Sequence, residues 1–312
     1  MSPADQNNEL LQRHLGFAAF VLGSVAVFWK ALENLISFSL SHDYASHITL
    51  IIPVSAYLIY LKRDRIFLTR ARPLAWSILI LPGAILCWMV EKRVPTFLRG
   101  NELSLVTLAI VMIWISGFIF CYGTHAFAMG RLPLLFLLLL VPIPDIVIEK
   151  IILFLQAGSA SVAYGLLRLF SVPVFKQGFI LRLPTLDIEV AKQCSGIRSS
   201  LALLITALVV GEFVLLAVWR KALLVLSIIP VLILKNGVRI VAVALLSIYV
   251  NRGFLHGWLH TSGGILFYLL GLAILVPLVA GLRKSEARSD TARSTISTLA
   301  NRDRKAAIFL SR

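Results

Sequence analysis

The sequence predicts an all-α polytopic membrane protein with about eight transmembrane helices. Of its 312 residues, 59% are hydrophobic and only 14% are charged, whereas soluble domains are about half apolar and about one quarter charged. The apolar residues also fall in long uninterrupted blocks, of which 73–90, 103–122 and 264–282 are the clearest. A helix of about 20 such residues rises roughly 30 Å, which is the thickness of the hydrocarbon core of a bilayer.

The charge distribution supports the same class of protein. The formal net charge is +15, which in a soluble protein would suggest a nucleic-acid partner. Here the basic residues lie between the apolar blocks, as the orientation of membrane helices requires, so the expected partner is the lipid bilayer and no nucleic acid. The sequence has no Cys/His pairs with metal-ligand spacing and no phosphate-binding glycine loop. We therefore expect neither a metal nor a cofactor.

The positions of lysine and arginine predict how the chain is oriented. The basic segments 61–73, 219–221 and 283–312 are expected on the cytoplasmic side of the cell (inner) membrane. This path places both termini inside, and its weakest point is loop 92–100, which carries three basic residues but must lie outside. The predicted spans are 15–35, 48–61, 73–90, 103–122, 127–143, 199–218, 222–240 and 259–282.

Three regions follow from this reading. Residues 1–14 form a cytoplasmic N-terminus, and residues 15–282 form the integral membrane domain. Residues 283–312 contain eight basic residues and are mostly polar, so we expect a basic, disordered cytoplasmic tail.

Two stretches do not have the pattern of simple spans. Pro142 and Pro144 interrupt an apolar run, and the residues that follow, 146–170, are expected to form an interfacial or partly buried helix. In segment 172–193 apolar and other residues alternate, which is typical of strands. We expect a small extracytoplasmic β-hairpin that turns at Pro184-Thr185 and leads the chain to Cys194.

Three candidate residues then converge on the extracytoplasmic face. Cys194 precedes a span that enters the membrane from outside, and His260 lies at the outer mouth of the last span. The span that starts inside at Ala222 reaches the outer face near Arg239, after roughly the thickness of a bilayer. The topology that brings them together was derived from charge placement alone.

The chemistry of this set suits acyl transfer by a cysteine. A thiol attacks well only as the thiolate, and a neighbouring histidine can take its proton and later protonate a leaving amine. Arg239 cannot act as a base, but it can hold a carboxylate or stabilise an oxyanion. Taken singly, each residue has a simpler interpretation: Cys194 as packing, Arg239 as an interfacial anchor, and His260 as an interfacial polar residue for which His256 is an equal rival.

Three sequence blocks resemble the signature blocks of the exosortase/archaeosortase family, whose members are polytopic membrane cysteine transpeptidases. They are "VAKQCSGIRSSLALL", "IIPVLILKNGVRIVAVALL" and "GWLHTSGGILFYLLGL". The resemblance implies that Cys194 is the nucleophile, that Arg239 is the family arginine and that His260, rather than His256, is the family histidine. "HDYASHITLIIPVSAYLIYLKR" and "LLLLVPIPDIVIEK" are also similar to earlier family blocks, so the resemblance extends over residues 40–282.

The resemblance implies a sorting enzyme that acts on exported proteins. Their C-terminal signal would contain a short motif such as Pro-Glu-Pro, a transmembrane helix and a basic tail. The enzyme would cleave near the motif, form a thioester and transfer the protein to a cell-surface acceptor of unknown identity. Arg198, Asn236 and Gly196 are expected on the substrate-binding side, because an arginine can bind the carboxylate of the motif and small residues leave room beside a nucleophile.

Three alternatives remain at this point. A plain cysteine protease would use the same residues with water as the acceptor. A transporter or channel is the general expectation for eight spans, and Glu212 within a span is the feature that favours it. A subunit of polysaccharide export machinery would have no activity of its own.

Overall fold

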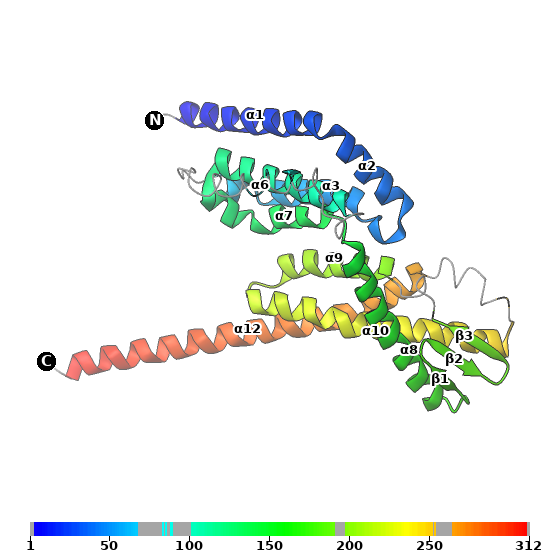
Figure 1. Ribbon diagram of the computed structural model, residues 1–312. Helices are drawn as coiled ribbons and strands as arrows, with labels where there is room; N and C mark the ends of the chain where they lie inside the picture. Colours follow the sequence, from blue (N-terminus) through cyan, green and yellow to red (C-terminus); the bar gives the residue numbers. More distant parts are fainter. Residues whose placement is uncertain are drawn as a thin grey trace. The chain divides into compact units, whose positions relative to one another are not determined.

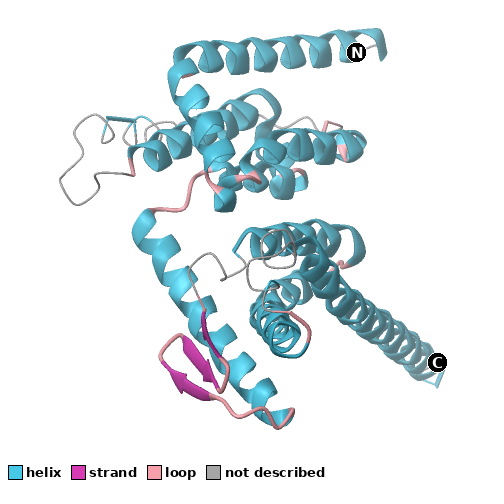
Figure 2. Cartoon of the chain, turned by 90° about the vertical axis from the view of Figure 1, so that its right-hand side faces the viewer, coloured by secondary structure: helices cyan, strands magenta, loops and turns pink. Residues whose placement is uncertain are grey.

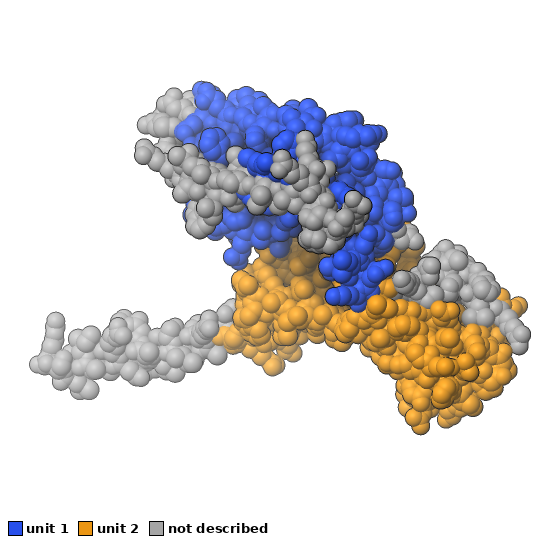
Figure 3. All heavy atoms as spheres, viewed as in Figure 1, with its two compact units in different colours: residues 1–150 blue, residues 151–312 orange. Residues whose placement is uncertain are grey.

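The structure is a computed structural model that describes residues 3–67, 101–190, 197–251, 253 and 264–310, together with four positions between 83 and 89. The chain divides into two compact units, Met1–Lys150 and Ile151–Arg312, which are coloured separately in Figure 3. Each unit has its own buried apolar cluster, and each is described here by itself.

The first unit is helical in its described part, and α6 is its central element (Figure 1). Helices α1, α2, α4 and α7 pack against α6, which is buried along most of its length because its residues are apolar on every face. The elements are α1 (Pro3–Val27), α2 (Trp29–Ser41), η1 (Asp43–Ala45), α3 (Ile48–Leu61), α4 (Arg63–Ile66), α6 (Glu102–Met129), α7 (Arg131–Phe136), η3 (Leu137–Leu140) and the start of α8 (Asp145–Leu169).

A kink in α6 replaces the break that we predicted between spans 103–122 and 127–143. Gly123 has φ 90° and ψ 169° within the helix, a conformation open to glycine because it has no Cβ. The helix resumes after this residue and ends at Met129, where the short α7 and η3 follow. The predicted span 127–143 is therefore the end of α6 followed by two short helical pieces.

The second unit combines one small sheet with long helices, and Figure 2 shows the sheet beside α8. Its apolar residues fall in two clusters, one under the sheet and one among the last three helices. After α8 its elements are β1 (Phe175–Gln177), β2 (Ile180–Leu183), β3 (Leu186–Glu189), α9 (Ile197–Val214), α10 (Val218–Tyr249) and α12 (Gly264–Leu310).

The sheet confirms the predicted hairpin and adds one strand to it. Strands β2 and β3 pair antiparallel with Leu183 opposite Leu186, so the chain turns at Pro184-Thr185 as expected. Strand β1, which was not predicted, pairs with the other edge of β2. Leu181 and Leu183 are buried against α8 and α10, whereas Arg182 between them is exposed. The alternation seen in the sequence is therefore the alternation of two faces of a sheet.

The described helices confirm a polytopic membrane protein, with differences in individual spans. Six described helices are long and apolar enough to cross a membrane. One of them is α8, where we predicted an interfacial or partly buried helix at 146–170, and its length and composition would also allow a full crossing. The predicted span 48–61 is a helix of only 14 residues, and nearly all of 73–90 lies outside the described residues. The six are 8–27, 102–129, 145–169, 197–214, 218–249 and 264–289.

Helix α12 continues through the residues that we expected to form a disordered tail. Its backbone is helical from Gly264 to Leu310, a range that includes most of the predicted tail. No glycine or proline occurs after Gly281, and the alanine, arginine and lysine residues of this segment have high helix propensity.

Candidate functional site

Helix α10 runs antiparallel to both α9 and α12, as pairs of contacts at its two ends show. At one end Lys235 contacts Ser199 in the first turn of α9, and Arg239 lies over Phe267 in the first turn of α12. At the other end Arg220 of α10 binds Glu286 of α12. The first turns of α9 and α12 and residues 235–239 of α10 therefore lie at the same end of this three-helix group.

Lys235 is the most buried cation at that end. Lys235 is 1% exposed, and its Nζ donates a 2.6 Å hydrogen bond to Ser199 Oγ. The alkyl stem lies beside α12, with Cδ 3.4 Å from the point where a Cβ on Gly271 would be. Because Gly271 has no side chain, α12 can approach the lysine closely. Among the described residues, the hydroxyl of Ser199 is the group that accepts a hydrogen bond from the Lys235 ammonium group.

Arg239 lies one helical turn after Lys235. Its guanidinium carbon is 5.9 Å from the centre of the Phe267 ring, a distance at which a cation is attracted to the ring face. Phe267 of the third sequence block therefore lies beside the arginine of the second block. Arg198, the second residue of α9, is exposed.

Asn236 connects α10 to α8 rather than facing an open surface. The residue is 1% exposed, and its Nδ2 donates a 3.0 Å hydrogen bond to Ser159 Oγ on α8. The next residue, Gly237, allows this approach, because a Cβ added there would be 2.5 Å from Val162 Cγ1. The Asn-Gly pair thus brings two apolar helices into close contact around one buried hydrogen bond.

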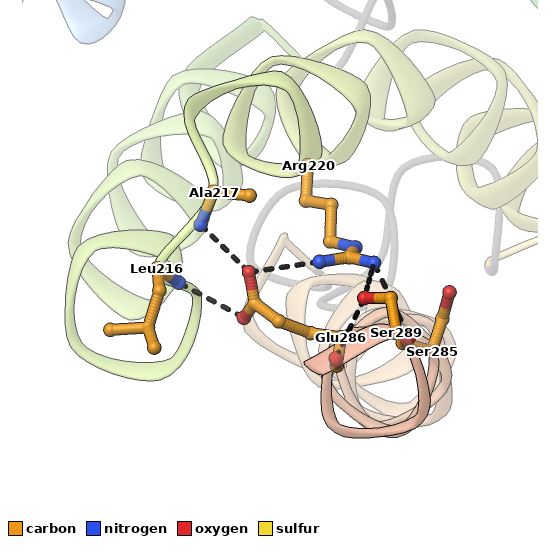
Figure 4. Close-up of polar contacts among 6 residues, drawn as sticks. All are labelled: Leu216, Ala217, Arg220, Ser285, Glu286 and Ser289. Carbon is orange, nitrogen blue, oxygen red and sulfur yellow. Dashed lines mark hydrogen bonds and ion pairs between the residues drawn. The ribbon is translucent and has the colours of Figure 1, made fainter. Parts of the chain in front are cut away.

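The opposite end of the group is closed by a buried ionic network (Figure 4). Glu286 accepts hydrogen bonds from the backbone nitrogens of Leu216 (3.0 Å) and Ala217 (2.7 Å) and from Arg220 Nη1 (3.1 Å). Arg220 Nη2 donates to Ser289 Oγ at 2.8 Å. The network links the α9–α10 connection to α12, and so it holds all three helices in one register.

The remaining predicted site residues fall outside the described part of the chain. Cys194 and Gly196 are in segment 191–196, which directly precedes α9, and His260 is in segment 254–263, which directly precedes α12. Their described chain neighbours are at the Arg239 end of the group, because both helices begin there. Among the described residues, no group of three or more His, Cys, Asp or Glu side chains could hold a metal ion.

Sequence reasoning did not select Lys235, Ser199 or Gln156. Lys235 could have been found, since it is a cation that follows a long apolar run and stands four residues before Arg239, on the same helix face. Ser199 and Gln156 could not, because their partners, Lys235 and the carbonyl of Val190, are distant in the sequence.

Comparison with known proteins identifies the family. A family model described as transmembrane exosortase (Exosortase_EpsH) matches residues 37–277, which is more than three quarters of the chain. No curated protein and no solved structure matched. The matched range includes all three sequence blocks and the helices that present Lys235 and Arg239. The chain therefore belongs to the transmembrane exosortase family, the membrane transpeptidases of protein sorting.

Proposed function

We propose that this protein is a cysteine transpeptidase that cleaves a C-terminal sorting signal on exported proteins, with Cys194 as the nucleophile. One observation carries the proposal. The helices that follow Cys194 and His260 begin at the same end of a three-helix group, and Arg239 lies at that end. Membership of the family supplies the reaction class.

The proposed reaction has two acyl-transfer steps. The Cys194 thiolate attacks the scissile carbonyl carbon, and His260 donates the proton with which the amine of the C-terminal fragment departs. A thioester links the exported protein to the enzyme. A nucleophile on the acceptor then attacks the thioester carbonyl while His260 takes its proton, and the Cys194 thiolate is released. In each step Arg239 stabilises the oxygen on which negative charge develops.

The proposed substrate is the three-part signal that the family resemblance implies. Its short motif carries a carboxylate, which Arg198 or Arg239 binds on the extracytoplasmic face. Its transmembrane helix packs beside α12, where a Cβ on Gly264 would meet no described atom within 4 Å. Gly196 leaves room at the nucleophile. Asn236, which is bonded to Ser159 in the interior, serves the site by holding α10 in place.

Replacement of the nucleophile tests the proposal. We expect Cys194→Ala and Cys194→Ser to abolish processing of a co-expressed protein that carries a Pro-Glu-Pro signal, while Cys121→Ala leaves processing unchanged. Normal maturation in the Cys194→Ala strain would refute the proposal. The mass of the new C-terminus in the wild type separates the acceptors, because hydrolysis leaves a free carboxylate and transfer adds a group.

Accessibility of the thiol tests the orientation. We expect a membrane-impermeant maleimide added to intact spheroplasts to label Cys194 in a variant without the other two cysteines. Labelling only after the membrane is permeabilised would place the site on the cytoplasmic side, contrary to the proposal.

A further inference from the structure

Two buried polar side chains bind described residues on either side of segment 191–196, the segment that contains Cys194. Gln156 of α8 binds the residue before the segment, Val190, and Lys235 of α10 binds Ser199 just after it. On the basis of the proposed function, we propose that Gln156 and Lys235 are positioning residues, which set where the nucleophile segment leaves the sheet and enters α9.

The end that leaves the sheet is held from two sides. Val190 is 1% exposed, and its backbone nitrogen donates a 2.9 Å hydrogen bond to the carbonyl of Phe179. Its own carbonyl accepts a hydrogen bond from Gln156 Nε2. Gln156 is 4% exposed, so water cannot readily replace this donor. The chain therefore leaves β3 from a defined point on the surface of α8.

The end that enters α9 is held by a cation. Ser199 Oγ accepts the 2.6 Å hydrogen bond from Lys235 Nζ, and Lys235 is 1% exposed. A hydrogen bond to a charged, buried donor is stronger than one between neutral groups, and loss of its partner leaves a buried charge without that bond. The first turn of α9 is thereby tied to the middle of α10.

Both ties rest on the same pair of helices. On α8, Gln156 lies one turn before Ser159. On α10, Lys235 is adjacent to Asn236. A 3.0 Å hydrogen bond between Ser159 and Asn236 joins the two helices. The ties to Val190 and to Ser199 therefore both come from this one pair of hydrogen-bonded helices. Precise placement matters for catalysis, since a displacement of about 1 Å can reduce a rate roughly a hundredfold.

The alternative is that these residues only stabilise the fold. The two roles differ in where the chain loosens when a tie is removed. A positioning tie protects the segment between its anchors, so its removal loosens that segment and leaves the rest of the second unit unchanged. A purely structural residue stabilises the whole helix group, so its removal accelerates opening throughout the unit.

Hydrogen–deuterium exchange on the full-length protein in detergent micelles makes this distinction. We expect Gln156→Met and Lys235→Met to speed exchange in the peptide 190–200 by about fivefold or more, with wild-type exchange in 264–282. Ser227→Ala is the matched control on α10, because the one partner of its hydroxyl in the described part of the chain is the carbonyl of Leu224 in its own helix. Wild-type exchange at 190–200 in both methionine variants would overturn the inference.

Ser199→Ala supplies a second, milder variant. It removes the bond to Lys235 without altering α10, so it carries the test if Lys235→Met disturbs the whole unit. We expect Ser199→Ala to speed exchange at 190–200, and Lys235→Met/Ser199→Ala to exchange no faster than Lys235→Met, because both changes remove the same interaction. Wild-type exchange in Ser199→Ala would exclude a tie at this end.

The outcome is separable from that of the proposed function. Normal processing by Cys194→Ala would refute the transpeptidase whatever the exchange data show. Loss of processing in Cys194→Ala, together with wild-type exchange in the Gln156 and Lys235 variants, would leave the transpeptidase in place and remove only the positioning role.

Discussion

Arg220 of α10 and Glu286 of α12 form an ion pair with 3.1 Å between Nη1 and Oε1, and each side chain is only 7% exposed. The pair joins residues that are 66 positions apart in the sequence. Its glutamate also accepts the two backbone N–H groups of the α9–α10 connection, so three interactions depend on this one carboxylate.

Removal of Arg220 should destabilise the second unit. Arg220→Met leaves Glu286 without its cation, and breaking a buried pair from one side costs about 3–5 kcal/mol in protein interiors. Because this pair lies at the end of the helix group, where solvent is close, we expect about 2–3 kcal/mol. The measurement is the thermal midpoint of the purified protein in micelles. Lys221→Met is the control, because Lys221 also pairs with a carboxylate, Glu212 at 2.5 Å, but its side chain is 23% exposed. A loss of stability in Lys221→Met as large as that in Arg220→Met would contradict the prediction.

Gly237→Ala should separate α10 from α8. The new Cβ would lie 2.9 Å from Val162 Cβ, an atom fixed close to the backbone, and overpacking of this kind costs about 1–3 kcal/mol. Gly165→Ala on α8 is the control, since no atom lies within 4 Å of its added Cβ, and its stability should be unchanged or slightly higher. Thermal midpoints compare the two. Val162→Ala added to Gly237→Ala should restore part of the loss; no recovery would mean that the clash is elsewhere.

Arg239→Lys should reduce processing far more than Arg198→Lys. Lysine keeps the charge but loses the planar, bidentate geometry and the weak hydration that suit a cation beside the Phe267 ring. If Arg239 stabilises the oxyanion, the rate should fall on the order of 100-fold, at an unchanged level of protein in the membrane. Arg198 is exposed, and we expect Arg198→Lys to slow processing only about tenfold, the loss expected when one bidentate contact to the substrate is removed. Pulse–chase processing measures both, and equal rates for Arg239→Lys and wild type would exclude the role.

Leu181→Ala should detach the sheet from its support without preventing insertion. Leu181 is fully buried between β2 and the helices α8 and α10, and such truncations cost about 2–5 kcal/mol. The ties at Val190 depend on that packing, so processing should fall while the protein still fractionates with the membrane. The neighbouring Arg182 is exposed, and Arg182→Ala should process normally. If both variants behaved alike, the packing of the sheet would have no bearing on activity.

The first unit should lose stability in acid through His47. Burial lowers the pKa of His47 below its usual value of 6.5, so the unfolded chain binds a proton more readily than the folded one. Stability is then fully present above about pH 6.5 and declines as the pH falls through that value toward the lower folded pKa. Thermal midpoints between pH 8 and pH 5 should fall less in His47→Gln than in the wild type. The exposed His42 serves as the comparison, and His42→Gln should follow the wild-type curve.

Several features were predictable because they depend on short stretches of sequence. Uncharged apolar blocks indicated membrane helices, and the alternation around Leu181 with the turn at Pro184-Thr185 indicated the hairpin. The three motif blocks indicated the family. Each of these signals is contained within about 20 neighbouring residues, so no knowledge of the packing was needed to read it.

Other features depended on how separate helices lie against one another. Two prolines suggested that α8 would lie at the interface, and the structure adds that the helix begins after them and runs for 25 residues, long enough to cross a membrane. The sequence showed basic residues at 219–221 and did not show that Arg220 would find Glu286. Likewise Lys235 was visible as a cation in a span, but its contact with Ser199 required the antiparallel register of α9 and α10.

What residue order determined here was local: which segments are apolar enough for a bilayer, where the chain turns, and which motifs it carries. Only the tertiary structure decided which polar side chains meet, because a contact between Gln156 and Val190 or between Lys235 and Ser199 depends on the register and rotation of whole elements. Those are set by the summed packing of many apolar side chains and by glycines such as Gly237 and Gly271 that let helices approach.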